Sequence, residues 1–272
     1  MLFCILNMSQ SNGLSNRLKK LVNDGKNLND DSSLSEKILA DTMSEIIPYA
    51  TTVFKPHGYN IVMEKQISLY ECQTFFEKAG GPIPNPDNKN VSMRPDGGIL
   101  FAISDNKRIP ILIVEDKVQG TNDTLFIQNK KRQSTGNAIE RAAKNIRGAE
   151  MLFTGLDIFP YVLFASGCDF HSTETISKRI EMMNFGYPNN YIDITTETTK
   201  EQINTNIRSI IESLDVKKKR GKCVVSVCVK AHKWDEMGHG SSRWEKDEQL
   251  HILKKVIDSV YENLAIYLKQ DT

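Results

Sequence analysis

The chain has 272 residues, of which 39% are hydrophobic and 25% are charged, a composition typical of globular proteins. The formal net charge of +1 excludes a strongly basic protein, so any contact with nucleic acid must come from local clusters of Lys and Arg. No apolar run approaches the roughly 20 residues of a membrane-spanning helix, so we expect no membrane contact.

The five cysteines are odd in number and include no Cys-x-x-Cys pair, which indicates reduced thiols and a cytoplasmic protein. Cys223, Cys228, His232 and His239 resemble a set of zinc ligands. The two cysteines lie five positions apart in an expected strand, where their side chains point to opposite faces. We therefore exclude a shared ion for this set.

Residues 1–34 are expected to form a flexible arm, because residues 8–34 are polar and rich in Asn, Ser, Asp and Lys. The opening MLFCIL lacks the basic flank and the length of a secretory signal. Two interpretations of it stay open: an extra N-terminal turn or strand, or a segment that precedes a true start at Met8. Residues 35–272 are expected to form a single folded domain.

The first expected helix is capped by Ser33 or Ser35 and runs to about Ile47, just before Pro48. Strands are expected at 59–64, 99–104, 109–116, 160–166 and 223–231, and further helices at 67–79, 136–153, 199–214 and 243–268. The strand at 109–116 is apolar throughout, which is typical of a strand covered on both faces. Strands interspersed with covering helices predict an α/β fold with a central mixed β-sheet flanked by helices.

Two carboxylates stand at the ends of the expected hairpin, Asp96 just before its first strand and Glu115 at the end of its second. The hairpin brings both to the same end of the sheet, and Lys117 projects on the same face as Glu115. With the backbone carbonyl of Asp116, the carboxylates make an oxygen site suited to Mg²⁺, and Lys117 can orient and help deprotonate a metal-bound water for attack on a phosphodiester. A structural interpretation also exists, in which Asp96 makes an Asx turn and the other two are solvated.

The segment TGNAIERAAKNI at 135–146 opens another helix, with Asn137 and Arg141 one turn apart on one face. Asn suits bidentate pairing with adenine, and Arg with guanine. Lys130 and Lys131 lie just upstream in a basic cluster suited to phosphates. The alternative is a capped helix with a solvated polar face.

Together, RPDGGI, VEDK, GNAIER followed by KNI, FPYVLF and NFGYP closely resemble the EcoRI-type restriction endonucleases of the PD-(D/E)xK nuclease superfamily. The resemblance covers roughly residues 60–190 well. It implies a restriction-endonuclease-like fold and a homodimeric, Mg²⁺-dependent type II enzyme. Such an enzyme cuts double-stranded DNA at a palindrome to leave 5′-phosphate ends with 5′ overhangs, alongside a protecting DNA methyltransferase.

By position in the motifs, the resemblance implies that Asp96 and Glu115 hold the metal with the Asp116 carbonyl and that Lys117 assists the water. Residues of the helix start would read an inner AATT, and Glu140 would hold the recognition network together. The DNA-binding set is Lys130, Lys131, Gln133, Asn137, Ala138, Glu140, Arg141 and Arg179.

Two positions depart from the family pattern. Gln133 stands where the pattern has Met, and Ile176 replaces the first of two arginines, of which Arg179 matches the second. These positions bear on the outer base pair in the family, so we expect the AATT core to be kept and the outer pair to be different or relaxed. Two other functions stay open: a repair or resolvase-type nuclease without sequence specificity, and a DNA-binding protein without catalysis.

Overall fold

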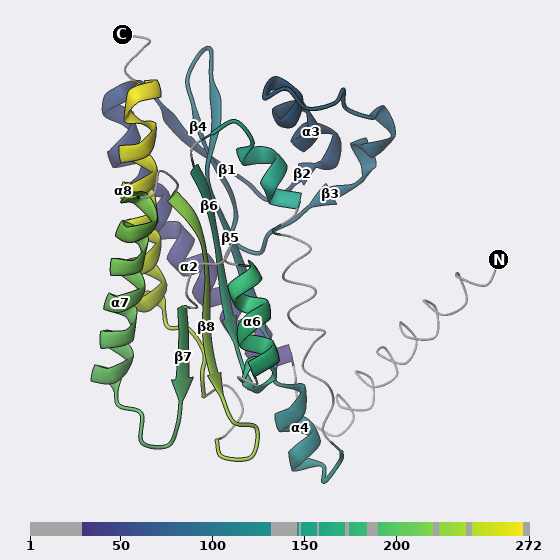
Figure 1. The fold of residues 1–272 in the computed structure, drawn as a ribbon, viewed down its shortest axis with the longest axis vertical. Helices are drawn as coiled ribbons and strands as arrows, with labels where there is room; N and C mark the ends of the chain where they lie inside the picture. Colours follow the sequence, from purple (N-terminus) through teal and green to yellow (C-terminus); the bar gives the residue numbers. More distant parts are fainter. Residues whose placement is uncertain are drawn as a thin grey trace, which may run out of the picture.

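The computed structural model describes residues 29–131, 146, 148–156, 158–171, 174–183, 190–219, 223–237 and 241–268. Its centre is a six-stranded sheet with the strand order β1-β4-β5-β6-β8-β7 (Figure 1). The strands are β1 (Asn60–Glu64), β4 (Gly98–Ile103), β5 (Arg108–Val118), β6 (Ile158–Ser166), β7 (Asn190–Ile194) and β8 (Cys223–His232). β1, β4 and β5 pair antiparallel, whereas β5, β6, β8 and β7 pair in parallel. The predicted α/β fold with a mixed sheet is confirmed.

Helices lie on both sides of this sheet (Figure 1). One side carries α2 (Asn29–Phe54), α7 (Lys200–Lys219) and α8 (Lys246–Leu268), and the other carries α6 (Glu174–Met183). Every residue of β6 is buried, as is the central part of β5. Helices on both sides of the sheet therefore explain the apolar run that predicted a strand covered on both faces.

Shorter elements complete the described part of the chain. The strands β2 (Ile67–Ser68) and β3 (Ser92–Met93) form a separate two-stranded antiparallel sheet, and the helix α3 (Leu69–Lys78) follows β2. The remaining short helices are η1 (Lys55–His57), η2 (Pro86–Asn90), α4 (Thr121–Ile127) and η3 (Cys168–Phe170). Within the described residues, no helix combines the length and the apolar character that crossing a membrane requires.

The first helix differs from the prediction at both ends. It begins by Asn29, inside the expected arm, so neither Ser33 nor Ser35 caps it, and it continues through Pro48 to Phe54. The ring of Pro48 faces solvent, whereas Ala50 and Phe54 are fully buried. Burial of these apolar side chains against the sheet therefore offsets the backbone hydrogen bond that Pro48 cannot donate.

Apart from the two-residue strands and the 3-10 helices, three described elements were not predicted: α4, α6 and β7. The first of them is short, and its start has no local side-chain cap. Instead, the Asp169 carboxylate accepts the backbone N–H groups of Thr121 (3.2 Å) and Asn122 (3.1 Å). Because this cap comes from a residue 47 or 48 positions later, no local pattern indicates it.

Candidate active site

The loop before β4 is held against β5 by close backbone contact. The Gly97 N–H donates to the Val114 carbonyl at 2.9 Å, and a Cβ on Gly97 would lie 2.7 Å from the Val114 Cβ. Gly98 has a φ of +80°, in the left-handed region that favours glycine. The two glycines thus let the loop approach β5 closely enough for Asp96 to accept the Asp116 N–H at 3.3 Å.

The Lys117 ammonium lies between the two predicted carboxylates. Its Nζ atom is 2.6 Å from Asp96 Oδ2 and 2.5 Å from Glu115 Oε1, and it donates to the Asp116 carbonyl at 3.0 Å. Burial alone would lower the pKa of Lys117, but the charges of Glu115 and Asp96 outweigh it and raise the pKa. The structure therefore brings the sequence-predicted triad together, with the lysine protonated.

Glu115 is nearly fully buried, with 1% of its surface exposed, and it faces a neighbour that the sequence analysis missed. Tyr161 lies on β6 opposite Ile113, two residues before Glu115, and therefore shares its face of the sheet. Burial, followed by the negative charges of Glu115 and Asp96, raises the pKa of Tyr161 well above its usual value. The phenol stays protonated beside the carboxylates.

The Asp116 side chain was also missed, because the motif assigns only its backbone carbonyl. Its Oδ2 atom accepts a hydrogen bond of 2.5 Å from the Ser35 hydroxyl of α2. Burial raises the pKa of Asp116 to about 6; the Ser35 bond opposes the rise, and Asp96 and Glu115 add to it. With Glu36, Asp96, Lys117 and Val118, Asp116 lines a hollow of about 170 Å³.

These residues fit a hard divalent cation. Two carboxylates, from Asp96 and Glu115, contact one ammonium, and the Asp116 carbonyl adds a neutral oxygen. Among the described residues, the buried Oδ1 atom of Asp116 has no hydrogen-bond partner. An all-oxygen, electronegative site of this kind suits Mg²⁺.

The predicted DNA-binding residues fall into two groups. Lys130 and Lys131 are exposed just after α4, and Arg179 is exposed on α6. Lys130 Nζ donates to Gln128 Oε1 at 2.6 Å. The others lie outside the described residues: Gln133, Asn137, Ala138, Glu140 and Arg141.

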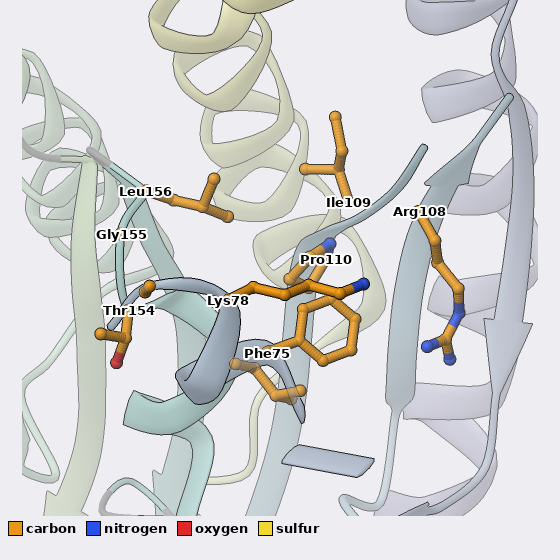
Figure 2. Close-up of a pocket in the computed structure, with 10 residues that line it drawn as sticks. Phe75, Lys78, Arg108, Ile109, Pro110, Thr154, Gly155 and Leu156 are labelled. Atoms are coloured by element: carbon orange, nitrogen blue, oxygen red, sulfur yellow. The ribbon is translucent and has the colours of Figure 1, made fainter. Parts of the chain in front are cut away.

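A second hollow, of about 240 Å³, lies at the other half of β5 (Figure 2). Its Arg108 guanidinium is paired with Glu64 at 2.7 Å and Glu71 at 2.6 Å and stacks 3.7 Å above the Phe101 ring. The ten residues that line this hollow include no carboxylate, so it lacks the oxygen ligands that the triad presents.

Two comparisons with known proteins bear on the site. A family model described as "Restriction endonuclease EcoRI" matches residues 73–270. A curated relative, "Type II restriction enzyme EcoRI" of Escherichia coli, is 38% identical over 98 residues, which is 32% of this chain and 35% of the relative. The chain thus matches about a third of the length of that relative.

Proposed function

The chain belongs to the family of the restriction endonuclease EcoRI, and from that premise we propose that it is a type II enzyme that hydrolyses phosphodiester bonds of double-stranded DNA with Mg²⁺. Its site is a short palindrome containing AATT, cut to leave 5′-phosphate ends with 5′ overhangs. A homodimer suits such a site, because each subunit reads one half of a two-fold sequence. The enzyme acts alongside a DNA methyltransferase.

The observation that carries this proposal is the convergence of Asp96 and Glu115 on the ammonium of Lys117. The two carboxylates come from different segments, and rigid sheet geometry holds both at one end of a buried hairpin. In the Arg108 ion pairs both carboxylates are partly exposed, whereas Lys117 pairs with the buried Glu115 as well as with the more exposed Asp96. A metal-assisted phosphodiesterase needs this arrangement.

Mg²⁺ would be held by Asp96, Glu115 and the Asp116 carbonyl. When bound, the ion supplies positive charge to the phosphate and acidifies a coordinated water. Because Glu115 is buried and its strand is paired on both sides, its carboxylate is fixed before any ligand arrives. Preorganisation of this kind lowers the cost of placing the phosphate in line with the water.

Lys117 acts as a hydrogen-bond donor and a countercharge. Its raised pKa keeps it protonated, and a metal ion that takes over Asp96 and Glu115 would free its N–H groups for the attacking water and a phosphate oxygen. Tyr161, also protonated, supports the Glu115 carboxylate from β6 and excludes water from that side. In this protonation state Lys117 does not take a proton from the water, which differs from the deprotonating role expected from the sequence.

For recognition we propose the roles implied by the family motif. Lys130 and Lys131, both exposed, contact phosphates. Gln133, Asn137, Ala138, Glu140 and Arg141 form the recognition segment for AATT. Arg179 is exposed on α6, which leaves its guanidinium accessible to the outer base pair.

Cleavage of supercoiled plasmid DNA tests the chemistry. We expect cutting in Mg²⁺, none in EDTA, and none by Asp96→Asn or Lys117→Met, while Asp105→Asn in the exposed β4–β5 turn cuts normally. Undiminished cutting by Asp96→Asn would refute the proposed metal site. A folded wild-type chain that binds AATT duplexes without cutting them would instead identify a DNA-binding protein without catalysis.

A further inference from the structure

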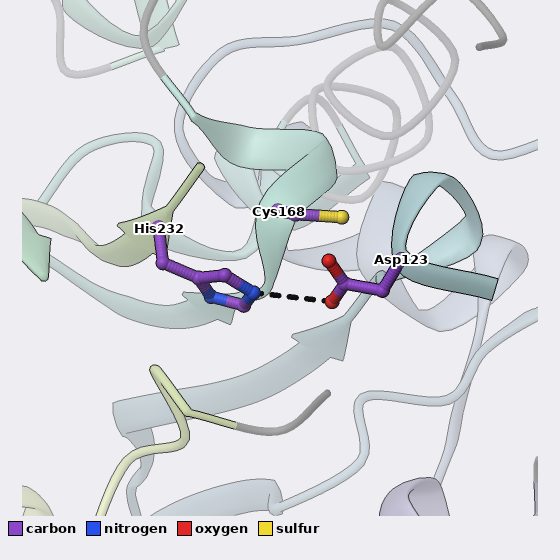
Figure 3. A group of neighbouring side chains, drawn as sticks. All are labelled: Asp123, Cys168 and His232. Atoms are coloured by element: carbon purple, nitrogen blue, oxygen red, sulfur yellow. Dashed lines mark hydrogen bonds and ion pairs between the residues drawn. The ribbon is translucent and has the colours of Figure 1, made fainter. Parts of the chain in front are cut away.

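A second group of metal-binding side chains lies apart from the triad (Figure 3). Asp123, Cys168 and His232 come from α4, η3 and the last residue of β8. α4 follows β5, η3 follows β6, and His232 ends β8. Because these three strands are parallel, all three residues lie near the carboxyl ends of the strands. One donor atom from each lies within 4.8 Å of the others, and all three residues are buried.

The imidazole of His232 is held at both nitrogens. Nε2 lies 3.1 Å from Asp123 Oδ2, and Nδ1 lies 2.8 Å from the Ser242 hydroxyl. The Gly167 N–H donates to the same hydroxyl at 3.1 Å, which fixes the position of Ser242. The ring is thus oriented by a second residue so that Nε2 faces the other two side chains, as in many metal sites.

The surroundings of Cys168 are electronegative. Its Sγ atom lies 3.5 Å from Asp169 Oδ1, and the Asp123 carboxylate is also close. Burial, followed by the charges of Asp169 and Asp123, strongly raises the pKa of the Cys168 thiol. A thiol in such a place does not ionise by itself, but a divalent cation binds thiolate strongly enough to displace the proton.

We propose that Asp123, Cys168 and His232 form a structural site for zinc or a similar divalent cation that binds thiolate. The donors are one sulfur, one nitrogen and one oxygen, each of which zinc accepts, whereas Mg²⁺ disfavours sulfur, and a water would complete the four-coordinate set. On binding, the S–H bond of Cys168 breaks, its proton passes to solvent, and a metal–sulfur bond forms. The His232 proton then resides on Nδ1 and is donated to Ser242, which leaves the Nε2 lone pair for the metal.

The site would stabilise the base of the proposed recognition segment. α4 begins four residues after Lys117 and leads directly into the basic residues Lys130 and Lys131. A metal bound by Asp123, Cys168 and His232 would join α4 to η3 and β8, adding to the cap that Asp169 gives the first turn of α4. The role assigned is structural and does not depend on the nuclease chemistry.

Cobalt spectroscopy on the full chain tests the proposal. Chelator-treated protein is titrated with Co²⁺ in excess Mg²⁺, which occupies oxygen-only sites. We expect one equivalent of Co²⁺ to give a thiolate-to-cobalt charge-transfer band in the near ultraviolet. Cys168→Ser loses the band, whereas Cys72→Ser, at another buried cysteine in α3, keeps it.

Two further variants separate this site from its alternatives. Ser242→Ala releases the His232 ring, while the Gly167 N–H keeps its bond to the Lys230 carbonyl at 3.2 Å, and it weakens Co²⁺ binding about tenfold or more. Asp96→Asn keeps the band even if it abolishes cleavage, so the two sites are distinguished. Absence of the band in wild-type protein that is folded by circular dichroism would overturn the proposal. An unchanged band in Cys168→Ser would also overturn it. The cluster would then be a network of buried hydrogen bonds without a metal.

Discussion

Lys117 Nζ lies 2.6 Å from Asp96 Oδ2, which joins the loop before β4 to the far end of β5 by an ion pair. The same nitrogen is 2.5 Å from the buried Glu115 carboxylate. A cation that binds between the two carboxylates must therefore compete with the ammonium. In the proposed metal site, the lysine would balance the charge of the two carboxylates when no metal ion is bound.

Replacing Lys117 separates its role in chemistry from its role in charge balance. In Lys117→Met we expect cleavage to fall by about 100-fold or more, because a donor to the transition state is lost. Binding of Mg²⁺ should strengthen, because the competing positive charge is gone. Cleavage rates and calorimetric titration with Mg²⁺ measure the two effects, with Lys65→Met at an exposed position as the control. Weaker Mg²⁺ binding by Lys117→Met would contradict the substitute role.

The buried Asp116 predicts a pH dependence of stability in chelating buffer. Its folded-state pKa of about 6 lies above the ordinary value of 3.8, so the folded chain binds the proton more tightly than the unfolded chain. Stability is therefore lost as the pH rises from about 4 to about 6 and stays lower above that. Asp116→Asn removes this penalty. The free energy of unfolding of the variant relative to the wild type should therefore be about 2–3 kcal/mol higher at pH 8 than at pH 4.

Urea denaturation of the wild type and Asp116→Asn at both pH values measures this gain. Ser35→Ala is the complementary variant, since it removes the hydroxyl that stabilises the ionised carboxylate. It should destabilise the chain more at pH 8 than at pH 4. Equal effects of Asp116→Asn at the two pH values would show that the carboxylate titrates normally.

A second buried ion pair joins Lys230 of β8 to Glu248 of α8. Lys230 Nζ is 2.9 and 3.0 Å from the two Glu248 oxygens and donates to the Arg243 carbonyl at 2.9 Å. Glu248→Gln should cost about 3–5 kcal/mol of unfolding free energy, because the ammonium then stays buried beside a neutral group. The double variant Lys230→Met/Glu248→Leu should recover most of it. A double variant that is less stable than both single variants would show that the pair itself is required.

Arg179 tests the assignment of the outer base pair, which rests on the proposed function. In Arg179→Ala we expect the AATT core to be kept and preference at the flanking pair to weaken by about 1–3 kcal/mol. Lys178→Ala, at the adjacent exposed residue, is the control because Lys178 already pairs with Glu174 at 2.6 Å. Sequencing of cleaved ends from both variants gives the comparison. Unchanged flanking preference in Arg179→Ala would remove this residue from the reading set.

The hairpin of β4 and β5 could be predicted from the sequence because its signals are local. The Pro-Asp-Gly-Gly turn before β4, two apolar runs and a spacing of two between Glu115 and Lys117 define which groups meet. The prediction that the first helix ends at about Ile47 was wrong, and the cause is equally clear. Pro48 is a local stop signal, but the burial of Ala50 and Phe54 is a tertiary gain that no local pattern contains.

The missed residues of the site all depend on distant contacts. Tyr161 reaches Glu115 only through the parallel pairing of β5 and β6, and Asp116 meets Ser35 across 81 positions. His232 appeared in a zinc-like pattern with neighbours in sequence, whereas the structure gives it Asp123 and Cys168 from two other elements. Side-chain chemistry was visible in the sequence, but the partners were set by the topology of the sheet.

The most direct test of the central claim is digestion of a plasmid library that carries NAATTN sites, with Mg²⁺, followed by sequencing of the cut ends. The account predicts cleavage at a defined subset of AATT sites with 5′ overhangs, and none with Asp96→Asn. Cutting without sequence preference would support the proposed nuclease activity of the triad, but it would contradict the claim that the enzyme reads AATT.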